Sequence, residues 1–144
     1  MQTFLPYPDF AASASALDSR RLGKQRVEAY QILRILRGEY AGRGWRHHPA
    51  VAMWRGFEDA LGLYMNAMIA EWVRRGYKNT MALYAAPADP EMPPWLGDPA
   101  LHAAYRSNLL RKAPDFYRQY GWTEPADLPY VWPVGGKPAE AISS

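Results

Sequence analysis

Residues 17–33 read LDSRRLGKQRVEAYQIL, and they decide how the rest of the chain is organised. With a helical period of about 3.6 residues, one face of this stretch and of the turn after it is apolar and carries Leu22, Ala29, Ile32, Leu33 and Leu36. The other face is polar and carries Arg20, Arg21, Lys24, Glu28 and Gln31. The pattern predicts an amphipathic helix that ends near Gly38, because glycine readily takes the left-handed conformation that follows a helix.

Glu28 is a single carboxylate among the cations of this helix. It lies one turn from Lys24 and two turns from Arg21. One interpretation is an exposed ion pair that tempers repulsion between the cations, and such a pair contributes a few tenths of a kcal/mol. This interpretation fits less well here, because Lys before Glu is the weaker orientation and one carboxylate cannot offset several cations. A functional carboxylate in a positive field is the alternative.

Length and composition restrict the class of protein. A chain of 144 residues, 49% apolar and 14% aromatic, is long enough for one globular domain with a core. No apolar run approaches the roughly 20 residues that span a bilayer, and residues 1–6 lack the basic and apolar regions of a signal peptide. Without cysteine there is no disulfide and no thiolate metal site. We therefore expect a cytoplasmic protein.

The formal charge of +3 is distributed unevenly along the chain. Residues 20–48 hold eight Lys and Arg against two acids, whereas the remainder holds nine against twelve. Positive charge that is concentrated in this way suits an anionic polymer such as nucleic acid. A surface that only favours solubility is the other interpretation, and composition alone does not separate the two.

The rest of the chain predicts a small helical bundle. Two prolines force residues 1–8 into an extended arm, and its apolar side chains indicate that the arm is pinned against the body. Residues 9–17 predict a short helix. A second long helix is expected from Pro49 to a stop signal at residues 74–76, and its apolar repeat consists of Trp54, Leu61, Tyr64, Met65, Met68 and Trp72.

A third helix is predicted from Asp98, a helix cap followed by proline, to about Lys112. Before it, residues 86–97 contain four prolines and predict a rigid loop. An aromatic segment follows the third helix, residues 134–144 predict a flexible tail, and no segment shows strand alternation. The expected fold is therefore all-α: a single-domain bundle of three main helices over residues 1–133, with an extended N-terminal arm and an aromatic C-terminal segment.

Several kinds of active site find no support in the sequence. The adjacent pair His47 and His48 has no carboxylate at ligand spacing, so no metal site is expected. The glycines match no phosphate-binding spacing, and no serine lies on the sharp turn that a nucleophilic triad needs. What remains is Glu28 with its cations, the basic loop that ends at His48, and the aromatic segment. Cationic side chains can bind the DNA phosphates, and aromatic side chains can stack against a base that has left the helix. This combination is typical of an enzyme that acts on a nucleobase. Packing against the bundle is the alternative for Tyr117, Tyr120 and Trp122.

Three motifs resemble those of a known family. The first runs from Leu17 and Asp18 through Arg21 and Leu22 to Glu28. The second is EWVRRGY at residues 71–77, with GWRHHP at 44–49 upstream, and the third is PDFYRQYG at 114–121. In order and spacing, over about 120 residues, they resemble the pyrimidine-dimer DNA glycosylases and abasic-site lyases of bacteriophages and bacteria, the endonuclease V type.

The resemblance implies an all-α DNA-repair enzyme that needs no cofactor and no metal. Glu28 would be the catalytic carboxylate. The free α-amine of Met1 would attack the sugar C1′ and form an imine, from which β-elimination nicks the strand. Contacts to damaged double-stranded DNA are carried over to Gln2, Arg20, Arg21, Lys24, Arg26, Arg46, His48, Tyr117 and Tyr120. The protein is expected to be a monomer.

One departure from the family affects the nucleophile. The best-known members expose a small residue, usually threonine, after the initiator methionine is removed. Here Gln2 follows Met1, and glutamine is too large for normal removal. Either Met1 is the nucleophile, or the protein is a glycosylase without lyase activity, or the chemistry has been lost. The other functions that fit are a non-catalytic nucleic-acid-binding module of the same fold and a glycosidase for another modified base.

Overall fold

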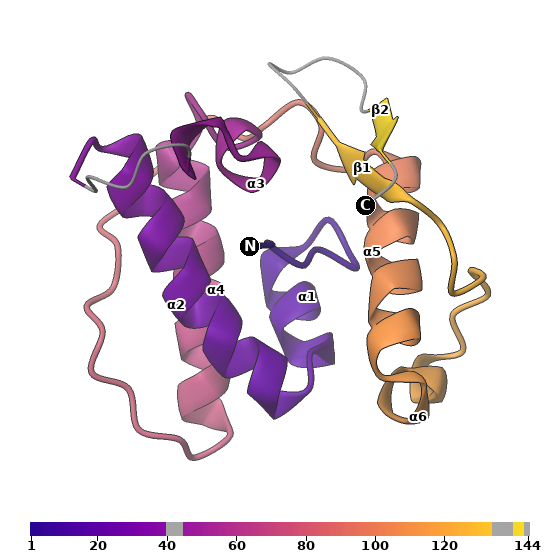
Figure 1. Ribbon diagram of the computed structural model, residues 1–144. Coiled ribbons are helices and arrows are strands. Elements are labelled where there is room, and N and C mark those ends of the chain that lie inside the picture. Colours follow the sequence, from indigo (N-terminus) through magenta and orange to yellow (C-terminus); the bar gives the residue numbers. More distant parts are fainter. Residues whose placement is uncertain (40–44, 134–139, 143–144) are drawn as a thin grey trace.

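The computed structural model describes residues 1–39, 45–133 and 140–142, and this part of the chain forms a mostly helical bundle, as predicted. The three main helices are α2 (Ser19–Leu36), α4 (Glu58–Arg74) and α5 (Pro99–Lys112). Figure 1 shows α2 beside α4, with the N-terminus near the middle of the molecule, between this pair and α5. The short helix α1 (Phe10–Ala16) packs on α4.

Short elements complete the fold. The helical turns are η1 (Trp45–His47), α3 (Pro49–Ala52), α6 (Pro114–Tyr117) and η2 (Arg118–Tyr120). No segment of the sequence shows strand alternation, but the structure contains two short strands, and β1 (Tyr130–Trp132) pairs antiparallel with β2 (Glu140–Ile142). Strands of three residues are too short to show an alternating pattern. Most of the predicted C-terminal tail, residues 134–139 and 143–144, lies outside the described residues.

The first long helix follows its sequence signals. The Asp18 side chain caps α2 by accepting a hydrogen bond from the Arg21 N–H, and Gly38 takes the left-handed conformation, with φ of 74°, after the last turn. Of the predicted apolar face, four residues are fully buried, namely Leu22, Ala29, Ile32 and Leu33. The helix also buries one polar residue, Gln25, on the same side.

The second long helix is interrupted, which the sequence did not predict. Helix α3 ends at Ala52 and α4 begins at Glu58. Between them Gly56 has a φ of 87°, which lies outside the helical region. Glu58 and Asp59 then provide the negative charge that favours the start of a helix.

Residues 71–77 tie the end of α4 to the start of α2. The Glu71 carboxylate accepts hydrogen bonds from Arg74 and Arg75, at 2.7 and 2.8 Å, and the Arg75 guanidinium also donates to Leu17 O at 2.6 Å and Ser19 Oγ at 3.1 Å. The hydrogen bond from Arg74, together with the charge and hydrogen bonds of Arg75, outweighs the effect of burial and lowers the pKa of Glu71 to about 2. The motif therefore has a structural role at this helix junction.

We expect Gly23→Ala to destabilise the protein by up to about 2 kcal/mol. An added Cβ would lie 2.7 Å from Cζ3 of Trp72, and this ring is held in place by its N–H, which donates to Lys78 O at 2.9 Å, and by stacking on Tyr77. Crowding of this kind costs about 1–3 kcal/mol, more than the roughly 1 kcal/mol by which alanine favours a helix over glycine. Urea unfolding measures the change. The control is Gly23→Ala in a Trp72→Phe background, where the smaller ring should remove most of the loss.

The N-terminal arm is extended and pinned to the body, as predicted. The His102 Nδ1 lies 2.8 Å from Leu5 O, and the Arg106 guanidinium donates to Pro6 O at 2.7 Å. The Ser13 hydroxyl donates to Tyr7 O at 2.8 Å. Side chains of α1 and α5 thus hold successive carbonyl groups of the arm.

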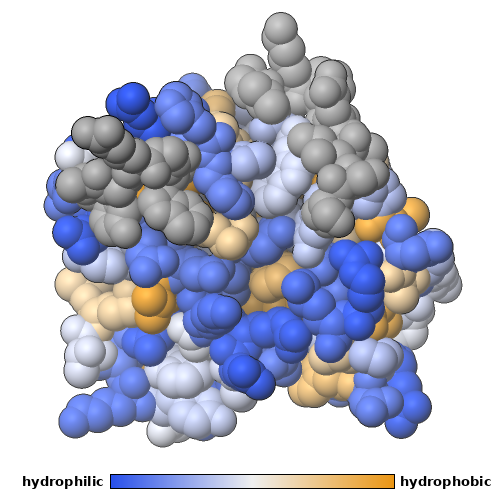
Figure 2. All heavy atoms as spheres, in the orientation of Figure 1, coloured by the Kyte–Doolittle hydropathy of each residue, from blue (hydrophilic) through white to orange (hydrophobic). Residues whose placement is uncertain are grey.

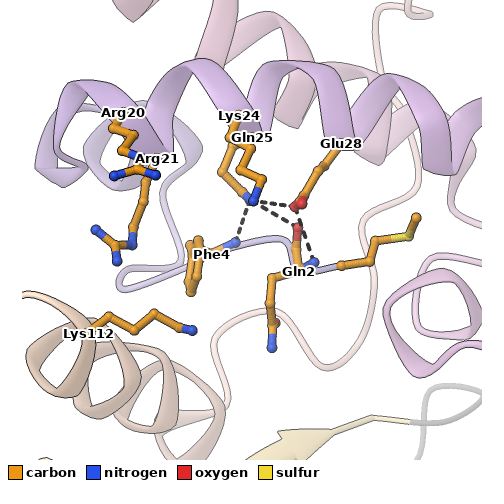
Figure 3. Close-up of a pocket in the computed structure, with 9 residues that line it drawn as sticks. Gln2, Phe4, Arg20, Arg21, Lys24, Gln25, Glu28 and Lys112 are labelled. Carbon is orange, nitrogen blue, oxygen red and sulfur yellow. Dashed lines mark hydrogen bonds between the residues drawn. The ribbon is translucent and has the colours of Figure 1, made fainter.

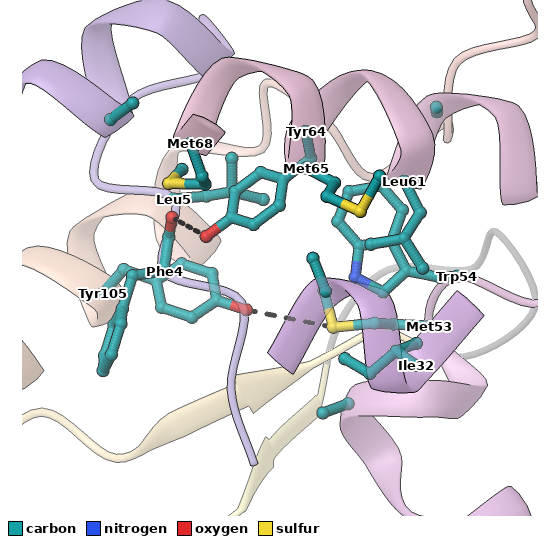
Figure 4. Packing of buried hydrophobic residues seen from close by; sticks show 14 of the residues in the cluster. Phe4, Leu5, Ile32, Met53, Trp54, Leu61, Tyr64, Met65, Met68 and Tyr105 are labelled. Atoms are coloured by element: carbon teal, nitrogen blue, oxygen red, sulfur yellow. Dashed lines mark hydrogen bonds between the residues drawn. The ribbon is translucent and has the colours of Figure 1, made fainter. Parts of the chain in front are cut away.

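The arm also contributes apolar side chains to the core. Phe4 and Leu5 are buried, and the Phe4 ring meets the Tyr105 ring edge-on at 6.3 Å. Figure 4 shows these arm residues among side chains of α4 and α5, with the Tyr64 hydroxyl donating to Phe4 O at 2.9 Å. The start of the chain is therefore an integral part of the fold, and the position of its first residues is set by the core.

Candidate active site

A pocket of about 350 Å³ opens between α2, the N-terminal arm and the end of α5. Figure 3 shows the side chains of α2 on one side of it and Lys112 reaching in from α5 on the other. The lining residues are Met1, Gln2, Phe4, Arg20, Arg21, Lys24, Gln25, Glu28 and Lys112. In the orientation of Figure 1, the face of the molecule between α2 and α5 is largely hydrophilic (Figure 2).

Helix α2 supplies most of the polar groups because of its period. Arg20, Lys24 and Glu28 follow at four-residue steps, so they lie along one side of the helix. The end of α5 adds the cation of Lys112, in the last turn, where positive charge interacts favourably with the helix dipole. The pocket thus combines four cations with one carboxylate, a composition that suits a phosphate-bearing ligand.

The Glu28 carboxylate faces the N-terminal arm. Its Oε2 accepts a hydrogen bond from the Gln2 backbone N–H at 3.3 Å and another from Gln25 Nε2 at 2.9 Å. Within the described part of the chain, Glu28 makes no ion pair with a Lys or Arg side chain within 4.0 Å. This geometry argues against the interpretation of Glu28 as one partner of a surface ion pair with Lys24.

His48 lies near this carboxylate without lining the pocket. Its Nδ1 accepts a hydrogen bond from the Ala50 N–H at 3.0 Å and so caps α3, and its ring meets the Trp132 ring edge-on. Burial and the positive charge of the chain's terminal amine lower the pKa of His48, whereas Glu28 opposes the shift. His48 is therefore within electrostatic reach of the amine and of the carboxylate.

The aromatic C-terminal segment packs against the start of α2. Tyr117 is 0% exposed, its hydroxyl donates to the Asp18 carboxylate and accepts from the Asp18 N–H at 3.1 Å, and its ring stacks on Trp122. The Tyr120 hydroxyl donates to Ala16 O at 2.9 Å. Burial alone would raise the pKa of Asp18, but hydrogen bonds from Tyr117 and Arg21 outweigh it and lower this pKa. These contacts support the packing interpretation, and DNA contacts by Tyr117 and Tyr120 stay a prediction.

Besides His48, Tyr117 and Tyr120, two further predicted DNA contacts, Arg26 and Arg46, do not line the pocket. The Arg26 guanidinium lies over the Trp72 ring, 4.9 Å from its centroid, and donates to Asn79 Oδ1 at 2.5 Å. Arg46 is exposed, and its carbonyl oxygen accepts from the Arg55 guanidinium. The structure therefore brings six predicted residues together in the pocket: Met1, Gln2, Arg20, Arg21, Lys24 and Glu28.

Three lining residues were not predicted as site residues, namely the apolar Phe4 and the polar Gln25 and Lys112. Lys112 carries no local signal, because a basic last turn is common in helices and only the packing of α5 brings it to the pocket. Gln25 did carry a signal. It lies at the three- and four-residue spacing of the apolar stripe, between Leu22 and Ala29, and it is therefore a polar residue at a core position.

The described residues give no sign of a metal centre or of a membrane span. They contain no group of three or more histidine and acidic side chains placed to hold a metal ion. Over the same residues, no helix is both long and apolar enough to cross a bilayer.

Comparisons with known proteins place this chain in a family. A family model described as pyrimidine dimer DNA glycosylase matches residues 1–85, which include every lining residue of the pocket except Lys112. The matched residues hold the first two of the three sequence motifs. Searches of curated proteins and of solved structures gave no significant match. Because the family model covers more than half of the chain, the chain belongs to the pyrimidine dimer DNA glycosylase family.

Proposed function

We propose that this protein removes a damaged base, such as a pyrimidine dimer, from duplex DNA and that the N-terminal amine forms an imine with the exposed sugar. The observation that carries the proposal is the common pocket of Met1 and Glu28, in which Glu28 contacts the first residues of the arm. Membership of the family supports the glycosylase reaction, and the imine rests on the resemblance of the motifs and on the common pocket of Met1 and Glu28. The cytoplasmic location and the monomeric state stay predictions from the sequence.

The proposed reaction uses the amine and the carboxylate in succession. The neutral α-amine attacks C1′, and the bond from C1′ to the base breaks with its electron pair leaving on the base. Glu28 stabilises the positive charge that develops on the sugar. The nitrogen gives up a proton, and the bond from C1′ to the ring oxygen O4′ then breaks while O4′ takes up a proton. The nitrogen lone pair forms the C=N bond of a positively charged imine, which Glu28 also stabilises. Loss of a proton from C2′ then expels the 3′ phosphate, which is the lyase step. An α-amine suits the first step because α-amines keep a larger neutral fraction near pH 7 than lysine side chains do.

The cations of the pocket have a separate role in binding. Arg20, Arg21, Lys24 and Lys112 surround the proposed position of the sugar and would contact the phosphates on either side of it. Such contacts make affinity fall with salt concentration, because each neutralised phosphate releases counterions. DNA binding through these cations does not require Glu28. A non-catalytic DNA-binding module would therefore depend on the cations and not on the carboxylate.

Borohydride trapping tests the proposal. The protein is incubated with duplexes that carry an abasic site or ultraviolet-induced dimers, reduced with borohydride, digested, and mapped by mass spectrometry. We expect a covalent complex whose adduct lies on the α-amine of the peptide that begins with Met1. An adduct on Lys24 or Lys112 would support the pocket as the active site but would exclude Met1 as the nucleophile. No complex and no released base with either substrate would overturn the proposal.

A further inference from the structure

Gln25 is a buried polar side chain in direct contact with the arm and with Glu28. It is 2% exposed. Its Oε1 accepts from the Phe4 N–H at 2.8 Å and lies 2.7 Å from the Tyr64 hydroxyl, whose single proton goes either to this oxygen or to Phe4 O. Its Nε2 donates to Gln2 O at 3.0 Å and to Glu28 Oε2 at 2.9 Å. Both donor hydrogens of the carboxamide are therefore used, and its oxygen accepts at least the hydrogen bond from Phe4.

The orientation of this carboxamide follows from its partners. The Phe4 N–H needs an acceptor, whereas Gln2 O and the Glu28 carboxylate need a donor. Rotating the amide by half a turn would place NH₂ against N–H and oxygen against two oxygens, which replaces favourable contacts by repulsive ones. Only one orientation satisfies every partner, so the side chain is held rigidly although glutamine is flexible in water.

The contacts of Gln25 fix the position of the arm along α2. The side chain bonds to the carbonyl of Gln2 and the N–H of Phe4, as a neighbouring strand would, and through the same Nε2 it reaches Glu28. A shift of the arm by one residue would lose the bonds to Gln2 and Phe4 together. One side chain thus contacts both the first residues of the arm and the Glu28 carboxylate.

We propose that Gln25 is a positioning residue that sets the distance between the chain's first residues and the Glu28 carboxylate. The role rests on the proposed function, in which that distance controls imine formation. Gln25 does not touch the sugar in this proposal, and it acts through Gln2 and Glu28. Correct placement of reacting groups contributes strongly to rate, because small misplacements lengthen the approach of the nucleophile.

The arm has other anchors, so the proposal can be tested in folded variants. The Trp54 indole N–H donates to Thr3 Oγ1 at 3.0 Å, and His102 and Arg106 hold the carbonyls of Leu5 and Pro6. Removing the Nε2 donors of Gln25 should therefore loosen only the first residues of the arm.

The experiment compares Gln25→Glu and Gln25→Met with Tyr64→Phe. Both Gln25 variants lose the two Nε2 donors and keep a similar size, whereas Tyr64→Phe removes a hydroxyl beside Oε1 and leaves the donors intact. We expect the first-order rate of borohydride trapping at saturating abasic duplex to fall about tenfold in both Gln25 variants. The Kd for that duplex should stay within about twofold, and the control should keep the wild-type rate within about twofold.

A second measurement separates failure of this role from failure of the proposed function. Amide hydrogen exchange of Gln2, followed by NMR in the free protein, should become about tenfold faster in both Gln25 variants and stay unchanged in Tyr64→Phe. If the wild type gives neither a trapped complex nor a released base, the proposed function fails, and the exchange result still decides the positioning role. Wild-type trapping rates in the Gln25 variants, an equal loss in the control, or unchanged Gln2 exchange would each overturn it.

Discussion

Glu28→Gln should slow imine formation on an abasic duplex by about 10³-fold while leaving the affinity for that duplex equal or higher. Glutamine has the same size, and its oxygen can still accept from the Gln2 N–H and from Gln25 Nε2, so the arm keeps its place. What is lost is the negative charge beside the sugar, and groups in this role contribute about 10² to 10⁴ to the rate. Affinity does not fall, because the pocket is cationic and one opposing charge has been removed.

The control for Glu28→Gln removes a carboxylate elsewhere. Asp115 has a side chain that is 95% exposed and does not line the pocket, so Asp115→Asn changes the net charge equally. Single-turnover trapping rates and Kd values at one salt concentration should match those of the wild type within about twofold for this control. If Glu28→Gln also keeps the wild-type trapping rate, Glu28 has no catalytic role. If the wild type and Glu28→Gln both bind the duplex and neither reacts with it, the protein is better described as a non-catalytic DNA-binding module.

The helices were predictable because their signals are local. Asp18 caps α2 and Asp98 caps α5 with side-chain oxygens, and Gly38 ends the first of these helices in the left-handed conformation. The interruption at Gly56 was not predictable from the apolar repeat. Residues before and after Gly56, such as Trp54 and Leu61, are buried whether or not one continuous helix carries them.

The pocket was predictable only where one helix builds it. The period of α2 places Arg20, Lys24 and Glu28 on one side, and the structure keeps them together. Lys112 joins them because α5 packs across the arm, which is a contact between distant parts of the sequence. Residue type also did not show that Tyr117 is buried, since an aromatic side chain suits a core as well as a base.

Gln2→Thr should make borohydride trapping about 10²-fold faster than in the wild type. Threonine is small enough for the initiator methionine to be removed, so the nitrogen of residue 2 becomes the α-amine. In the present structure that nitrogen lies 3.3 Å from Glu28 Oε2. The Met1 amine lies one residue before this nitrogen, and one residue spans about 3.8 Å between Cα atoms, so the Met1 amine can lie several ångströms further from the carboxylate. Since a misplacement of about 1 Å can cost about 10²-fold in rate, moving the amine next to the carboxylate should recover a factor of this size.

The variant that separates the two effects of Gln2→Thr is Gln2→Leu. Leucine also removes the Gln2 carboxamide, whose oxygen is buried without a hydrogen-bond partner among the described residues, but it is too large to allow removal of Met1. Intact mass establishes which N-terminus each protein carries, and Gln2→Leu should trap at the wild-type rate within about threefold. Equal acceleration in both variants would assign the effect to the lost side chain. Slower trapping by a Gln2→Thr protein that lacks Met1 would contradict the prediction. It would show that the Met1 amine of the wild type is the better nucleophile, although the amine of residue 2 lies closer to the Glu28 carboxylate.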